Sequence, residues 1–154
     1  MACARDVDAT RSTKVELTAL NRDVREGLAR RIAALFQGMP NDIAHWPDGE
    51  KKYEALRLMR AKQEYEAPNG LGEQAVRWIQ QADRDLAFAA EYKPDPEAEA
   101  QGRLDPICDA IRNRNLLGRE LVRRIGQWWS KVKAGVAWLI VAVVVGYLIL
   151  RRLK

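Results

Sequence analysis

The sequence is poor in the residues from which catalytic and metal sites are usually built. It contains one histidine, His45, and two cysteines, Cys3 and Cys108. A zinc site needs several ligands at short spacing, and a catalytic site needs groups that exchange protons. His45 lies in a predicted loop beside Trp46, where packing at the surface is the simpler explanation. The sequence therefore predicts no catalytic residue, no metal ligand and no cofactor.

The carboxylates lead to the same conclusion. Glu64 and Glu66, like Asp83 and Asp85, are two positions apart, so on a helix they point to different faces. No glycine-rich loop of the kind that holds phosphates is present. We predict that the protein is not an enzyme, with an enzyme of unrecognised site as the alternative.

The two cysteines are far apart in the sequence and lack the spacing of a metal site. In a cytoplasmic chain, thiols stay reduced. We therefore expect Cys3 to be a solvent-exposed thiol and Cys108 to be a small apolar filler, and we predict no disulfide.

No segment alternates apolar and polar residues with the period of two that marks a strand, and no internal repeat is visible. Apolar residues recur instead every three or four positions, which is typical of helices that pack on one face. We predict an all-α protein. Its small cytoplasmic helical bundle, of about three helices, is followed by a long C-terminal helix that continues into a single transmembrane span.

The predicted helical domain covers residues 13–93 and follows a flexible N-terminus at residues 1–12. Thr13 and Glu16 match a capping box, which starts the first helix, and Gly38 ends it. An apolar stripe follows one face of this helix: Leu17, Leu20, Val24, Leu28, Ile32 and Leu35. The opposite face is predicted to be a solvated surface of charged residues: Arg22, Asp23, Arg25, Glu26 and Arg30.

Two more helices complete this domain. Asp48 suits the N-cap of the second helix, which is predicted to run to about Glu66. Its inward candidates are Tyr53, Leu56 and Met59. Residues 68–70, Pro-Asn-Gly, predict a turn, and the third helix then runs from about Leu71 to Tyr92. Its apolar stripe is Leu71, Ala75, Trp78, Ile79, Ala82, Leu86 and Ala89.

An acidic linker is predicted at residues 94–105, followed by a basic amphipathic juxtamembrane helix at residues 106–133. Asp105 as N-cap and Pro106 at the first helical position favour a helix start there. The helix either lies on the bilayer surface or completes a four-helix bundle, its arginines pairing with acids of the other helices, and both can hold for different halves. The points at which this long helix can bend are Asn113, Asn115, Gly118 and Gly126.

Residues 134–150 read AGVAWLIVAVVVGYLIL, without a charged side chain. A helix needs about 20 mostly apolar residues to cross a hydrocarbon core of about 30 Å, so this run is at the short end of the range. Lys133 and Arg151 extend it by sending their charged ends to the headgroups. We predict one transmembrane helix, with a helix buried in a soluble core as the alternative.

The residues near the two ends of this run are the predicted membrane contacts. The membrane-interface set is Arg119, Arg123, Arg124, Trp128, Trp129, Lys131, Lys133, Tyr147, Arg151 and Arg152. The span-packing set is Gly135, Ala142 and Gly146, small residues that permit close helix contact. No ionisable residue lies inside the run, which argues against a proton relay or a transporter core.

The net charge of +5 averages two unlike parts of the chain. Residues 1–108 hold 16 Lys and Arg against 19 Asp and Glu, giving −3, whereas residues 109–154 hold 10 against 2, giving +8. Because the basic part adjoins the predicted span, anionic lipid headgroups are its favoured partner, ahead of acidic proteins and of nucleic acid, which is unlikely.

The cations also predict an orientation. More of them precede the run than follow it in the basic tail at residues 151–154, and the first residues lack the apolar stretch of a signal peptide. The N-terminal bulk is therefore predicted to be cytoplasmic. This arrangement looks like that of tail-anchored proteins, a topological class.

The predicted function is non-enzymatic: a single-pass, C-terminally anchored membrane protein whose helical domain mediates protein–protein interaction or self-assembly at a membrane. The alternatives are a small membrane-perturbing effector, such as a toxin, lysis or injected viral protein, and a structural component of a membrane-containing viral or membrane-docked assembly.

Overall fold

The computed structural model describes residues 3–93, 95–101 and 106–152, and all the regular structure in these ranges is helical. The elements are α1 at Ala4–Phe36, a short 3-10 turn η1 at Ile43–His45, α2 at Glu50–Glu66, α3 at Leu71–Glu91, α4 at Pro96–Ala100 and α5 at Pro106–Arg152. The predicted all-α class is therefore confirmed.

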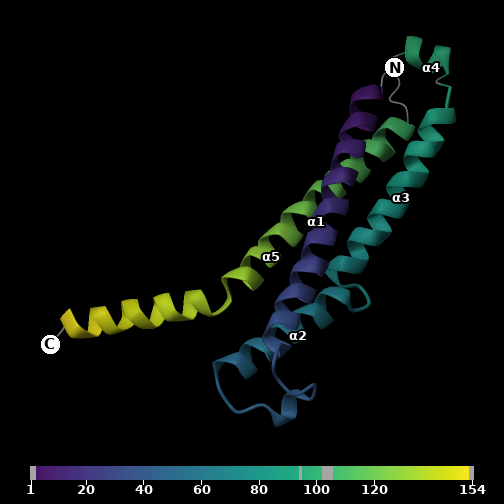
Figure 1. The fold of residues 1–154 in the computed structure, drawn as a ribbon. Coiled ribbons are helices and arrows are strands. Elements are labelled where there is room, and N and C mark those ends of the chain that lie inside the picture. The colour runs from purple at the N-terminus through teal and green to yellow at the C-terminus, as the bar shows by residue number, and fades with distance from the viewer. Residues whose placement is uncertain (1–2, 94, 102–105, 153–154) are drawn as a thin grey trace.

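Helices α1, α2 and α3 and the first part of α5 form an elongated bundle (Figure 1). The first part of α5 lies along α1, and its second part leaves the bundle at the end where α2 is found. Of the two alternatives for residues 106–133, the four-helix bundle is the one observed, because Ile111, Leu121 and Ile125 are buried in it.

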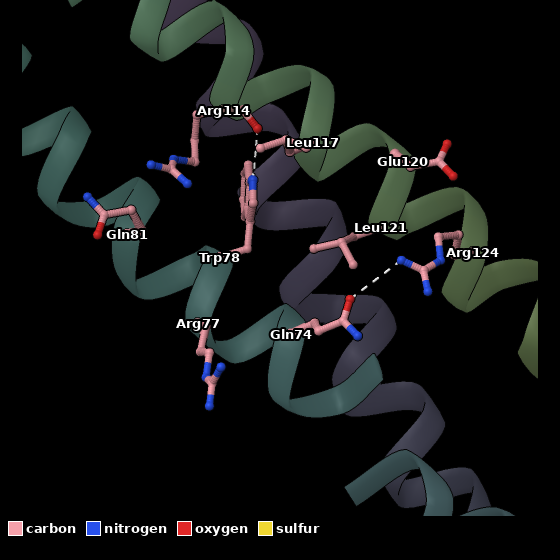
Figure 2. Close-up of a pocket in the computed structure, with 9 residues that line it drawn as sticks. All are labelled: Gln74, Arg77, Trp78, Gln81, Arg114, Leu117, Glu120, Leu121 and Arg124. Atoms are coloured by element: carbon pink, nitrogen blue, oxygen red, sulfur yellow. Dashed lines mark hydrogen bonds between the residues drawn. The ribbon is translucent and has the colours of Figure 1, made fainter. Parts of the chain in front are cut away.

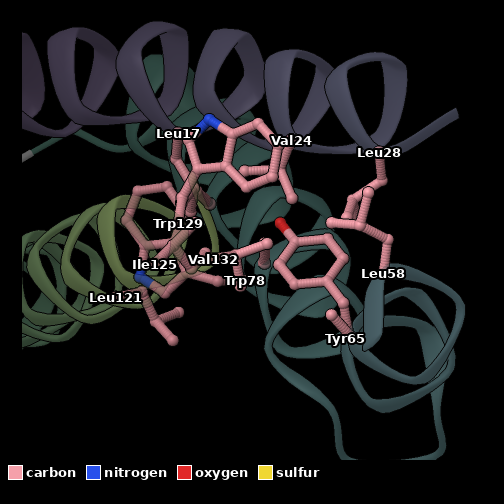
Figure 3. Close-up of a cluster of buried hydrophobic side chains, with 13 residues drawn as sticks. Leu17, Val24, Leu28, Leu58, Tyr65, Trp78, Leu121, Ile125, Trp129 and Val132 are labelled. Atoms are coloured by element: carbon pink, nitrogen blue, oxygen red, sulfur yellow. The ribbon is translucent and has the colours of Figure 1, made fainter. Parts of the chain in front are cut away.

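The core is one cluster of aliphatic and aromatic side chains from all four helices (Figure 3). Its large members include Leu17, Leu28, Leu58, Tyr65, Trp78, Ile125 and Trp129. The predicted stripes of α1 and α3 supply much of it, since Val24, Ala75 and Ala82 are fully buried. Burial raises the pKa of Tyr65 to about 12, so its hydroxyl stays protonated and donates to Asn21 Oδ1 at 2.8 Å.

The start of α1 differs from the prediction. The capping box at Thr13 is wrong, because α1 begins at Ala4 and Thr13 lies inside it, 1% exposed. Thr10 is also buried, and its hydroxyl donates to the Asp6 carbonyl at 2.8 Å. A threonine that satisfies its hydroxyl in the preceding turn can present its methyl group to a neighbouring helix. The buried stripe therefore continues through two polar residues, and residues 4–12 belong to the helix.

The inward face of α2 also differs from the prediction. Tyr53, Leu56 and Met59 are 64%, 43% and 40% exposed, so their assignment to the core is wrong. The buried residues are Ala55, Leu58, Ala61 and Tyr65. The two alanines let α2 approach its neighbours closely, while Leu58 and Tyr65 on the same face fill the core.

Two tryptophans lie against glycines where the helices pack most closely. The Trp78 indole of α3 covers Gly118, where a Cβ atom would collide with the ring, and its Nε1–H donates to the Arg114 carbonyl at 2.8 Å (Figure 2). Trp129 of α5 covers Gly27 of α1 in the same way, because a Cβ atom at Gly27 would lie only 2.5 Å from the ring. These contacts fix how α5 is placed along α1 and α3.

The structure joins Cys3 and Cys108 by a disulfide, with Cα atoms 5.2 Å apart. The prediction of two separate reduced thiols is therefore wrong, although Cys108 is buried at 6% exposure as expected. The starts of α1 and α5 lie side by side in space, which a sequence separation of 105 residues conceals. A disulfide that closes so long a loop lowers the entropy of the unfolded chain. In the chain-entropy description this raises the free energy of unfolding by about 4–5 kcal/mol.

The opposite charges of the two parts of the chain meet across the bundle. Three arginines of α5 face carboxylates of α1 and α3: Arg112 with Asp6 at 3.4 Å, Arg114 with Asp85 at 2.9 Å and Arg119 with Glu16 at 3.8 Å. The exposed pairs among them contribute little stability individually. They do show that part of the basic charge of α5 is paired with acids of α1 and α3.

Candidate functional site: the joint between the bundle and the C-terminal helix

The long helix α5 is interrupted at Gly135, where φ is 38° and ψ is −128°. Gly118 and Gly126, two of the points at which a bend was possible, lie within continuous helix, and Gly118 lies under Trp78. A positive φ favours glycine, and a Cβ here would also lie 2.5 Å from Arg57 Nη2. Gly135, predicted to pack within the span, instead forms the joint between the two parts of α5.

Arg57 of α2 holds the bundle side of this joint. Its guanidinium makes a two-pronged contact with Glu54, at 2.8 Å from Nε and 2.7 Å from Nη2, and Nη2 also donates to the Val132 carbonyl at 3.0 Å. The Glu54 hydrogen bonds raise the pKa of Arg57 further above its ordinary value. The break at Gly135 frees carbonyls of the last helical turn, and a cation is the favoured partner for such groups.

The two tryptophans predicted for the membrane interface are packed against the bundle. Trp129 is 8% exposed, and the half-buried Trp128 stacks on Tyr65 with ring centroids 5.1 Å apart. Their position at the end of the apolar run suggested a headgroup role, but the core of the bundle extends to this last turn. Their rings therefore fasten α5 to α1 and α2 immediately before the joint.

The cations predicted for the membrane interface are largely exposed where their side chains are described. They are Arg119, Arg123, Arg124, Lys131, Lys133 and Arg151. Arg123 donates to Glu120, with Nε 2.9 Å from Oε2. These hydrogen bonds lower the pKa of Glu120 and raise that of Arg123, so both stay charged. Lys131 and Lys133 lie next to the joint, and neither has a carboxylate within 4.0 Å among the described residues.

A groove of about 470 Å³ lies between α3 and α5, with Trp78, Leu117 and Leu121 among the side chains that line it (Figure 2). Its three guanidinium groups already have partners: Arg77 with Glu73 at 2.6 Å, Arg114 with Asp85 at 2.9 Å and Arg124 with Gln74 at 3.5 Å. The protein's own side chains therefore already supply the partners of the guanidinium groups in this groove.

A second groove, of about 650 Å³, lies between the end of α1 and the last turn of α5 before the joint. It is lined by Asp23, Gly27, Arg30, Arg31, Ala34, Trp129 and Lys133. The Arg31 Cζ and Lys133 Nζ atoms lie 5.8 and 5.6 Å from the Trp129 ring centroid. Sequence reasoning assigned Arg30 to a solvated surface and did not single out Arg31, since only packing against α5 reveals this groove.

Several predicted residues lie outside the described side chains. The side chains of Tyr147, Ala142, Gly146 and Arg152 are among them, as are most of residues 136–150. Among the described residues, no helix is both long and apolar enough to cross a bilayer. The apolar side chains described beyond the joint are those of Val145 and Ile149, which are 47% and 55% exposed.

Comparison with known proteins gives no relative. No protein-family model, no curated protein and no solved structure matches this chain.

Replacing Arg57 by Met should lower the free energy of unfolding by about 1–2 kcal/mol, because Glu54 and the Val132 carbonyl lose a charged donor. Arg60→Met is the matched control, since Arg60 is 82% exposed and, in the described part of the chain, forms its ion pair with Glu64 at 3.4 Å. The control should change stability by less than about 0.5 kcal/mol. Urea unfolding of the full chain in neutral detergent, followed by circular dichroism, measures both. Equal effects of the two substitutions would contradict the role given to Arg57.

Proposed function

We propose that this protein is a single-pass membrane protein, anchored by its C-terminal helix, whose helical bundle binds another protein or a second copy of itself at the membrane. One observation carries the proposal: an uncharged run of 17 residues, 134–150, leaves the bundle at Gly135, and its described apolar residues Val145 and Ile149 are uncovered. A bilayer covers such a helix on all sides, and in this reading the bundle sits at the membrane surface.

The exposed face of α2 supports the interaction part of the proposal. Tyr53, Leu56 and Met59 lie one turn apart on the outer side of α2, and Leu56 and Met59 line a groove of about 820 Å³ with Ile32 of α1. Arg57, on the same helix, contacts the joint. The face is thus an exposed apolar patch at the membrane end of the bundle, and such patches are typical of protein contacts.

The orientation in this proposal is the one that the cations predict, with the bundle in the cytoplasm. It has a consequence for Cys3 and Cys108, because the cytoplasm keeps thiols reduced. The disulfide of the structure is at odds with that orientation, so the redox state of the pair in cells is a direct test of it.

Charges placed in the run should release the protein from membranes. Val141→Arg combined with Val144→Arg puts two cations near the bilayer centre, at about 2.5–3.5 kcal/mol each. We expect the full-length wild type to stay in the membrane pellet after carbonate extraction and the variant to be released. Val15→Arg with Leu116→Arg is the control, since these positions are 71% and 61% exposed on the bundle. A wild type that carbonate extracts would refute the anchor.

Acidic substitutions on α2 should weaken self-assembly. Leu56→Glu with Met59→Glu places charges on the exposed apolar face, and we expect about tenfold less cross-linking between two differently tagged full-length copies in membranes. Val15→Glu with Leu116→Glu is the matched control and should cross-link like the wild type. Cross-linking that is unchanged by the α2 substitutions would exclude this face as the contact.

The state of the two cysteines in intact cells tests the orientation. Cells that express the full chain are lysed directly into denaturing detergent that contains a maleimide-linked polymer, so that the buried Cys108 is also exposed, and the mobility of the protein shows whether its thiols reacted. A cytoplasmic bundle predicts that Cys3 and Cys108 are both modified. Protection of both, removed only by prior reduction, would place the bundle on the oxidising side of the membrane.

A further inference from the structure

We propose that the groove formed by Arg30, Arg31, Trp129 and Lys133 binds the phosphate of an anionic phospholipid headgroup. This inference rests on the proposed membrane anchor and deepens it, because it names one lipid class and one site. It adds two residues of α1, Arg30 and Arg31, to a membrane surface that the sequence assigned to α5 and the tail alone.

The groove gathers cations that the protein itself leaves unneutralised. Arg30 donates from Nε to the Glu26 carbonyl at 3.4 Å, while Arg31 and Lys133 share the Trp129 ring. None of the three has a carboxylate within 4.0 Å among the described residues. The one acid of the groove, Asp23, lies 3.8 Å from Arg22 Nε.

Three cations line this one groove, and their combined field favours an anion inside it. A phosphate matches this arrangement, because guanidinium groups bind phosphate oxygens through two parallel hydrogen bonds and the lysine adds a point charge. The groove between α3 and α5 is the internal comparison. Its Arg77 and Arg114 hold Glu73 and Asp85, so it has no such deficit of negative charge.

The position of the groove favours a lipid over a dissolved phosphate compound. Lys133 directly precedes the apolar run, and Trp129 lies one helical turn before Lys133. Because α5 changes direction at Gly135, the groove lies at the point where the helix leaves the bundle, beside the headgroups when the run is inserted. Basic pockets at the edge of a span are typical sites for anionic headgroups.

The test is a titration of the full-length protein, in neutral detergent, with phosphatidylglycerol, phosphatidylcholine or inorganic phosphate, followed by native mass spectrometry. The site variant is Arg30→Gln with Arg31→Gln, and Lys133→Gln is a second variant on the other helix. The control is Arg5→Gln with Arg84→Gln, which removes the same charge from exposed positions at the opposite end of the bundle. Circular dichroism verifies the fold of each.

We expect phosphatidylglycerol to bind the wild type and the control equally. Binding should be about 30-fold weaker in the double site variant and about fivefold weaker in Lys133→Gln, and phosphatidylcholine should bind weakly throughout. Equal binding by wild type and site variants would overturn the proposal, and so would competition by inorganic phosphate at the same concentration. These outcomes are separate from failure of the anchor, which carbonate extraction of the wild type reports.

Discussion

The structure depends on how closely α5 lies against its neighbours. Trp78 fills the space over Gly118 and Trp129 fills the space over Gly27, so any side chain at either glycine would force the helices apart. Trp78 also donates its indole N–H to the Arg114 carbonyl, which fixes the position of α5 along α3 as well as its distance. Because α5 is held in this position, Gly135 lies at the end of the bundle. The Val132 carbonyl just before it is then within reach of Arg57.

The same position of α5 explains the uneven charge of the chain. Three arginines of α5 meet acids of α1 and α3, so part of the difference between −3 and +8 is offset where the helices pack. Among the described cations that have no carboxylate within 4.0 Å, Arg30, Arg31, Lys131 and Lys133 lie beside the joint. The end of the bundle that adjoins the apolar helix therefore carries cations that the described part of the protein leaves unpaired.

Much of the fold was predictable because it follows from local patterns. The stripes of α1 and α3 and the turn before Leu71 were read correctly, since large apolar residues at helical spacing and a Pro-Asn-Gly turn are unambiguous signals. Where those signals were weak, the prediction failed. Thr10 and Thr13 continue a buried stripe with their methyl groups, and α2 buries alanines while Tyr53 stays exposed.

The joint and its groove were less predictable, because they depend on contacts between distant residues. Nothing near Gly135 in the sequence indicates that Arg57 of another helix supplies a donor to Val132. The same holds for Cys3 and Cys108, which only the pairing of α1 with α5 brings together. A glycine at the second position of the uncharged run, directly after a basic stretch, was the one local signal that could have indicated a joint.

The central claim is that α5 changes its surroundings at Gly135, from protein to lipid. Spin labels placed singly along residues 123–148 of the full chain in lipid vesicles measure this directly through collisions with oxygen and with a water-soluble nickel complex. The account predicts nickel access at Arg123 and Gln127, and oxygen access without nickel access at every position from 139 to 145. Nickel access that persists beyond Gly135 with the period of a helix would contradict it and place this helix on a surface.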